Sequence, residues 1–208
     1  MTHSCMLQQT APFPAFAPLF APGPEGWTPF FSSLALPGLD PSFTMRVHPS
    51  FVPGDPGPIP EDPDEFAQEF VFDDPATGRS ARLELSCTRM LEGTLEKFRS
   101  GLEDVIAGMG RSMARTFGGI HHGTRRVRTG GLQAVETYIS GRKQTGKGGP
   151  GAMFGLFRSV IAEDMIFVLS FTSFYPARET VEGGYTPLGN PLLTEFGLPA
   201  MDSLTFTI

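Results

Sequence analysis

The sequence contains few residues of several informative types. Only two cysteines, Cys5 and Cys87, occur among 208 residues. A disulfide framework in a small secreted domain needs several cysteines, so that class of protein is excluded. Cys87 alternates with leucines, and we expect it to be a small buried apolar residue. Asparagine occurs once and lysine three times, and this bias toward arginine, alanine, glycine and proline suggests a GC-rich bacterial genome.

Long apolar runs are also absent. Five prolines interrupt the apolar segments near the N-terminus, at positions 12, 14, 18, 22 and 24. We therefore expect no signal peptide, since such a peptide needs an unbroken apolar region. No stretch approaches the roughly 18 apolar residues that a membrane-spanning helix requires. The default expectation is a cytoplasmic protein.

Motifs that would indicate catalysis or metal binding are missing or incomplete. His121 and His122 are adjacent in a predicted strand, so their side chains should point to opposite faces and cannot share one metal ion. The segment 141–147 resembles a phosphate-binding loop, but Gly148 occupies the place of the required serine or threonine. No Gly-x-Ser-x-Gly motif occurs. We predict a protein that is not an enzyme, with no cofactor and no metal.

The charges are unevenly distributed along the chain. Residues 1–74 contain ten acidic residues and one basic residue, whereas residues 111–147 contain eight basic residues and one acidic residue. Six of the latter form a candidate basic patch: Arg125, Arg126, Arg128, Arg142, Lys143 and Lys147. The patch indicates either ordinary solvated strands and loops, or binding of an acidic partner or a second copy of the chain. We expect no nucleic-acid binding, because aromatic residues are not interleaved with these arginines.

Residues 1–63 are predicted to form an extended, proline-rich arm that ends in a linker over 53–63. Proline disfavours helices and central strands. Large apolar residues distinguish this arm from a disordered polar tail. The candidate partner-binding residues are Phe13, Phe16, Phe20, Trp27, Phe30 and Phe31. The arm is expected either to wrap its own domain or to bind another subunit. Deletion of residues 1–60 is expected to leave the domain folded but to abolish partner binding.

Residues 64–208 are predicted to form one domain. The clearest element is a helix over 91–109, where apolar residues recur every three or four positions and Gly108 and Gly110 supply a stop. Strands are expected over 66–72, 80–88, 118–129, 131–140, 153–162, 165–174 and 204–208, with a short helix over 192–201. Tight turns between consecutive strands predict the α+β class, with a mainly antiparallel sheet packed against one long helix and a short C-terminal helix.

This order of elements resembles the PsbP-like superfamily and, within it, the bacterial DcrB-like branch. The resemblance covers residues 65 to 208 and rests on the strand 81–86, the helix 91–109, the strand opening at 130–138, the paired strands 157–162 and 165–171, and the closing segment 201–206. It implies a sandwich of helices and sheet without a catalytic centre. Known members act as accessory subunits or as chaperones, some of them homodimeric chaperones of type VI secretion effectors. No residue of a family site can be carried over to this sequence.

Three hypotheses on function follow. The first is a non-catalytic protein-binding domain that acts as an adaptor or chaperone through a sheet face and the aromatic arm. The second is a structural or accessory subunit of a larger assembly, with the arm wrapped on a neighbouring subunit. The third is an enzyme with a pocket between helix and sheet. In the first two, the partner is another protein or a second copy of the chain.

Overall fold

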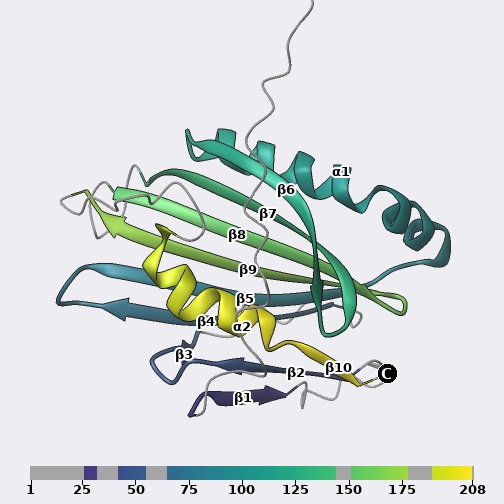
Figure 1. Ribbon diagram of the computed structural model, residues 1–208, viewed down its shortest axis with the longest axis horizontal. Helices are drawn as coiled ribbons and strands as arrows, with labels where there is room; N and C mark the ends of the chain where they lie inside the picture. The colour runs from purple at the N-terminus through teal and green to yellow at the C-terminus, as the bar shows by residue number, and fades with distance from the viewer. Residues whose placement is uncertain (1–25, 32–41, 55–64, 144–150, 178–188, 208) are drawn as a thin grey trace, which may run out of the picture.

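The computed structural model describes residues 26–31, 42–54, 65–143, 151–177 and 189–207, which form two sheets and two helices (Figure 1). The large sheet has seven antiparallel strands. In their order across the sheet they are β3 (Val52–Pro53), β4 (Glu65–Asp74), β5 (Arg79–Arg89), β9 (Met165–Pro176), β8 (Gly151–Ala162), β7 (Leu132–Lys143) and β6 (Ile120–Thr129). The small sheet consists of β1 (Thr28–Phe31), β2 (Ser42–Val47) and β10 (Thr205–Thr207). The helices are α1 (Glu92–Thr116) and α2 (Leu198–Asp202), the latter preceded by a π-helical turn at Leu193–Gly197.

This architecture confirms the predicted α+β class. The sheet is antiparallel throughout, one long helix packs on it, and a short helix lies near the C-terminus. The tight turn at Glu163 and Asp164 joins β8 and β9 as expected, and β9 is a central strand between β5 and β8. The alternation in β5 is also confirmed, because Leu83, Leu85 and Cys87 are all buried.

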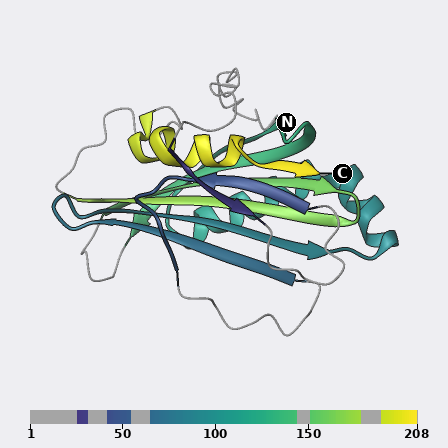
Figure 2. The same ribbon diagram turned by 90° about the horizontal axis from the view of Figure 1, so that it is seen from below.

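The front face of the large sheet carries the main core. The small sheet, the π-helical turn and α2 cover this face (Figures 1 and 2). Aromatic and aliphatic residues of β5, β8 and β9 pack there against residues of β2 and α2, including Phe43 against Phe167 with ring centroids 5.5 Å apart. The C-terminal helix is therefore part of the core.

The rear face is covered by α1, which packs on β6 and β7 and touches β8. Its end differs from the prediction, because the helix continues through Gly108 and Gly110 to Thr116. Gly110 is buried against the sheet, where a Cβ atom would lie 2.6 Å from Thr137 Oγ1. This glycine thus permits close packing of the helix on β7 and does not end the helix.

The segment before residue 64 contains strands that the sequence analysis did not predict. Proline was expected to disfavour helices and central strands over this segment, and no strand was predicted there, but β1, β2 and β3 form. The two prolines that lie within these strands, Pro29 in β1 and Pro53 in β3, are in edge strands. An edge strand tolerates proline because one of its sides needs no backbone donor. This accounts for β1 and β3, whereas β2, the central strand of the small sheet, contains no proline.

Four side chains of this segment are buried in the main core: Phe43, Met45, Val47 and Phe51. Trp27 is half-buried and packs edge-on against His48, with ring centroids 5.2 Å apart. The described part of the predicted arm therefore lies on its own domain. We accordingly expect that a chain lacking residues 1–60 will not fold, in contrast to the expectation from the sequence.

Candidate functional site

The large sheet ends at β6, and within the described residues no strand pairs with the outer side of β6. This strand has ten residues, with a bulge in its pairing with β7 between His121 and Gly123. The opposite edge ends in β3, which has two residues, one of them Pro53. Short edge strands and proline protect a sheet from further pairing. Within the described residues, β6 presents its outer side along ten residues, whereas β3 covers two residues of β4 at the opposite edge.

Apolar side chains flank the turn that leads from α1 into β6. Ile120 is 56% exposed and Phe117 is 37% exposed. The turn itself fits tightly on the end of β7, because a Cβ atom on Gly119 would lie 1.8 Å from the Ser140 carbonyl oxygen. The start of β6 thus presents an exposed isoleucine on a rigid corner of the fold.

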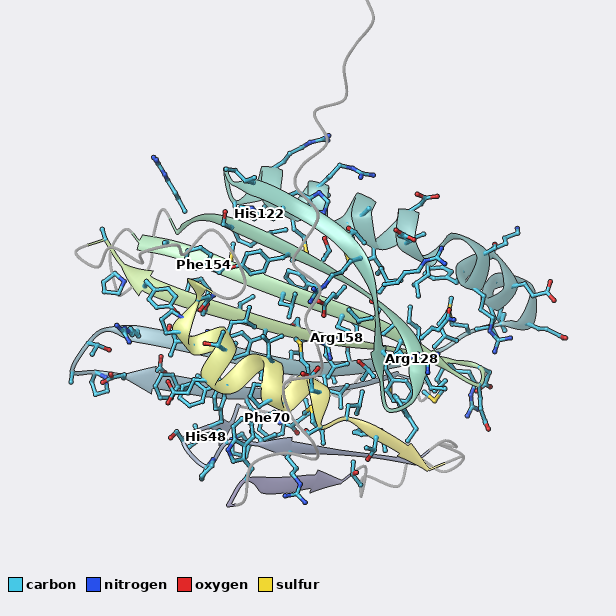
Figure 3. The ribbon with its side chains drawn as sticks, in the orientation of Figure 1. His48, Phe70, His122, Arg128, Phe154 and Arg158 are labelled. Atoms are coloured by element: carbon cyan, nitrogen blue, oxygen red, sulfur yellow. The ribbon has the colours of Figure 1, made fainter. Side chains whose placement is uncertain are left out.

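The predicted basic patch is divided between the two faces of the sheet. Arg125 points to the front face and forms an ion pair with Glu136 of β7. Arg126 points to the rear, where its Nε lies 2.8 Å from the Glu103 carboxylate of α1. Arg128 is exposed near the end of β6 (Figure 3), and Arg142 is exposed on β7.

The structure describes the two lysines of the patch only in part. Lys143 ends β7, where only its backbone is described, and Lys147 lies outside the described residues. Of the candidate aromatic residues, Phe13, Phe16 and Phe20 also lie outside the described residues. The backbones of Phe30 and Phe31 belong to β1.

A buried ion cluster on the front face was not predicted from the sequence. Arg158 of β8 donates from Nε to the Glu136 carboxylate at 2.9 Å and from Nη1 to Asp202 Oδ1 at 2.6 Å. Its Nη1 also donates to Thr129 Oγ1 at 3.1 Å. The cluster ties β6, β7 and β8 to the end of α2, and Figure 3 shows Arg158 in the middle of the sheet. The sequence feature that could have indicated this cluster is the single arginine within the mostly apolar segment that forms β8.

Arg158 keeps its charge within the cluster. Burial would lower the pKa of Arg158, but the carboxylates of Glu136 and Asp202 outweigh that effect and raise the pKa. Arg125 supplies a second cation to Glu136. All of these groups are engaged with one another, and the cluster therefore serves as an anchor between sheet and helix.

His121 and His122 point to opposite faces, as predicted. His121 Nε2 lies 2.8 Å from Thr137 Oγ1 on the rear face, and His122 Nε2 lies 2.7 Å from Ser140 Oγ on the front face. Burial lowers the pKa of both imidazoles, and a nearby arginine, Arg111, lowers that of His121 further. Both rings are thus held in hydrogen bonds within the fold.

A second polar network fixes the start of the C-terminal helical segment. The Tyr175 hydroxyl donates to Asn190 Oδ1 at 2.5 Å, and Asn190 Nδ2 donates to Ser173 Oγ at 2.9 Å. The Leu192 N–H donates to the Tyr175 hydroxyl at 3.0 Å. The single asparagine of the sequence thus has a structural role in joining this segment to β9.

No group of three or more histidine, cysteine, aspartate or glutamate side chains within the described ranges could hold a metal ion. In the part of the chain that is described, no helix is long and apolar enough to cross a membrane. The described residues form an α+β domain whose antiparallel sheet is covered on its front face and, over β6 to β8, on its rear face, with no strand paired to the outer side of β6.

No family model matches the sequence, and no curated protein is significantly similar to it. The solved structures that resemble the fold are remote. LpqN of Mycobacterium tuberculosis, involved in cell envelope biogenesis, is 16% identical over 81% of this chain and 85% of that chain, with a TM-score of 0.41. The Ran-binding protein Mog1p of Saccharomyces cerevisiae is 12% identical over 78% of this chain and 88% of that chain, with a TM-score of 0.43. A protein from Bacteroides thetaiotaomicron is 12% identical over 80% of this chain and 45% of its own, with a TM-score of 0.41.

Similarities this low establish neither a family nor a function for this chain. The DcrB-like branch of the PsbP-like superfamily therefore stays a prediction.

Proposed function

We propose that the chain is a non-catalytic protein-binding domain that acts as an adaptor or chaperone and holds an extended segment of its partner along β6. The observation that carries this proposal is that, among the described residues, no strand pairs with the outer side of the ten-residue strand β6. An exposed edge offers a row of backbone donors and acceptors to an added strand. Binding by strand addition gains affinity from these main-chain hydrogen bonds and specificity from the neighbouring side chains.

The side chains along β6 indicate the chemistry of the bound segment. Arg125 and Arg126 are already paired with Glu136 and Glu103, and they therefore do not repel an added strand as free charges would. Exposed Arg128 at one end of β6 and exposed Ile120 at the other favour a segment with an acidic residue and an apolar residue at its two ends. The partner is thus an extended, acidic and partly apolar protein segment.

The aromatic residues of the N-terminal segment are proposed as a second contact with the partner. Phe13, Phe16 and Phe20 are the candidates for this role, since Trp27 packs against His48 within the domain. Large aromatic residues dominate the binding energy of many interfaces. On this proposal the domain is cytoplasmic, and residues 1–25 and β6 contact the same partner.

The experiment compares two exposed apolar residues at opposite edges of the same sheet. Ile120 lies at the β6 edge and Val52 at the β3 edge, with exposures of 56% and 61%. The tagged chain would be recovered from cells that express it, at low salt, as the wild type, as Ile120→Asp and as Val52→Asp. We expect a stoichiometric partner with the wild type and with Val52→Asp, and its loss with Ile120→Asp. Equal retention by the two variants would show that β6 is not the binding edge.

A second candidate is an accessory subunit whose neighbour is another copy of the chain. The acidic residues 1–74 and the basic residues 111–147 favour it, because opposite charges on one chain promote self-association. The same recovery separates the two candidates. A different protein in fixed ratio indicates an adaptor or chaperone, whereas a second copy of the chain indicates self-assembly.

A further inference from the structure

A cavity of about 350 Å³ lies on the rear face between the N-terminal half of α1 and the strands β6, β7 and β8. Its size is at the lower end of the range for small-molecule sites, roughly 300–1,000 Å³. The cavity does not include the backbone edge of β6 that is proposed above to hold a protein segment. It is therefore a separate candidate site.

The cavity arises from the sequence of α1. The residues of α1 buried against the sheet are large in its first part (Leu95, Leu102 and Ile106) and small in its last part (Gly110 and Ala114). Gly110 allows the helix to approach Thr137 closely, whereas Leu102 and the half-buried Phe98 are larger and require more space. The helix is thus held close to the sheet at its C-terminal half, and the space remains under its N-terminal half.

The floor of the cavity is apolar. Leu102 of α1, Val135 of β7 and Ile161 of β8 line it, and the three belong to one packed cluster on the rear face. Contact with a surface of this kind favours a ligand with a hydrocarbon or aromatic body.

The rim carries an excess of positive charge. Arg99, Arg126 and Glu103 lie on it, and Glu103 already pairs with Arg126. Arg99 donates from Nη2 to the Glu163 carbonyl oxygen at 2.8 Å, and among the described residues it forms no ion pair. One guanidinium is therefore held in place without a carboxylate partner, at the mouth of an apolar cavity.

Arg99 is exposed and contacts an unusual turn. Glu163 joins β8 to β9 with a φ of 53°, in the left-handed region that favours glycine. The carbonyl oxygen of this residue receives the hydrogen bond from Arg99. A preorganised donor loses less conformational freedom on binding than a free arginine would, and it therefore suits recognition of an anion.

We infer that this cavity binds a small organic anion with an apolar body, such as an aromatic or aliphatic carboxylate. The carboxylate is bound by Arg99, with Gln133 on the lining as a further polar contact, and the apolar body lies on Leu102, Val135 and Ile161. Arginine is suited to this role because its planar guanidinium can donate two parallel hydrogen bonds to one carboxylate.

The test uses naphthoate as the probe and naphthamide, its neutral analogue of the same shape, as the matched ligand. Both are titrated into the full chain by calorimetry. We expect saturable binding of one naphthoate per chain, at least about tenfold tighter than naphthamide. Arg99→Gln should weaken naphthoate about tenfold and leave naphthamide unchanged, whereas Arg82→Gln, at an exposed arginine of β5 paired with Glu69, should leave both unchanged.

A second pair of variants tests the location without altering charge on the rim. Ser100 lines the cavity from α1, and Ser100→Phe should block naphthoate by filling it. Lys97→Phe places the same side chain on the same helix at an exposed position outside the lining, and this variant should bind normally. Circular dichroism would confirm that each variant is folded. The inference is overturned if naphthoate does not bind, if naphthamide binds equally well, or if Ser100→Phe binds as the wild type does.

Discussion

The guanidinium of Arg158 contacts the carboxylate of Glu136 at 2.9 Å, and both side chains are almost entirely buried, with 3% and 2% of their surfaces exposed. Asp202 and Thr129 satisfy the remaining donors on one side of Arg158. A buried pair of this kind does not by itself prove high stability, because desolvation opposes the attraction. It does make the loss of one partner costly.

Replacement of Arg158 by methionine should destabilise the fold strongly. The variant leaves buried Glu136 with Arg125 as its remaining cation and partly exposed Asp202 without this partner, and the loss should approach the roughly 3–5 kcal/mol seen when a buried pair loses one member. Urea unfolding followed by circular dichroism measures the difference. The control is Arg82→Gln, which removes a surface pair with Glu69 and should change the free energy of unfolding by less than about 1 kcal/mol.

Two glycines of α1 should respond oppositely to alanine. Gly110→Ala places a Cβ atom 2.6 Å from Thr137 Oγ1, and the resulting overpacking should destabilise the protein by about 1–3 kcal/mol. Gly101→Ala meets no atom within 4 Å and should stabilise the helix by about 0.5–1 kcal/mol. Thermal unfolding of both variants checks the contrast. A gain in stability for Gly110→Ala would contradict the close packing of α1 on β7.

The two histidines of β6 should make stability depend on pH. Burial lowers the pKa of His121 and His122 below the ordinary value of 6.5. As the pH falls through 6.5, the unfolded chain takes up protons before the folded chain does, and stability decreases. Urea unfolding at about pH 7.5 and about pH 5.5 would measure this loss. His122→Gln should reduce it, and an unchanged dependence in that variant would contradict the burial of the ring.

Two truncations should give different outcomes. A chain that begins at Gly26 keeps β1, β2 and β3 and should remain folded. A chain that begins after residue 60 lacks Phe43, Met45 and Phe51, all buried in the main core. Loss of each such side chain costs about 2–5 kcal/mol, and together these losses reach the total stability of a typical domain, about 5–15 kcal/mol. Circular dichroism and thermal unfolding distinguish the two. A cooperative transition in the shorter chain would show that the domain folds without the segment.

The sequence predicted the elements that depend on periodic patterns. The alternation around Leu83 and Leu85 and the helical spacing of α1 both follow from one buried face, and the structure confirms them. The strands before residue 64 were not predicted, because prolines obscured a pattern that edge strands tolerate. The end of α1 was wrong because Gly110 meets a residue distant in sequence, Thr137, and no local pattern reveals such a contact.

The same limit applies to the candidate sites. The run of arginines was evident in the sequence. That Arg125 pairs with Glu136 and Arg126 with Glu103 depends on the strand register and on the position of α1, which the sequence does not reveal. The ion cluster around Arg158 and the cavity under α1 join four or more elements that are far apart in the chain. The residues of neither site recur at a regular spacing along the chain, so one sequence alone does not reveal them. The open edge at β6 likewise follows from the order of strands in the sheet.

The central claim, that β6 holds an extended segment of a partner, is tested most directly by hydrogen exchange. Backbone amides of the chain would be followed by mass spectrometry, alone and in the complex recovered with its partner. The account predicts that amides of Ile120–Thr129 exchange more slowly in the complex, because their outer side gains hydrogen bonds, while those of β4 on the opposite side of the sheet do not change. Protection elsewhere in the domain, with β6 unchanged, would contradict it.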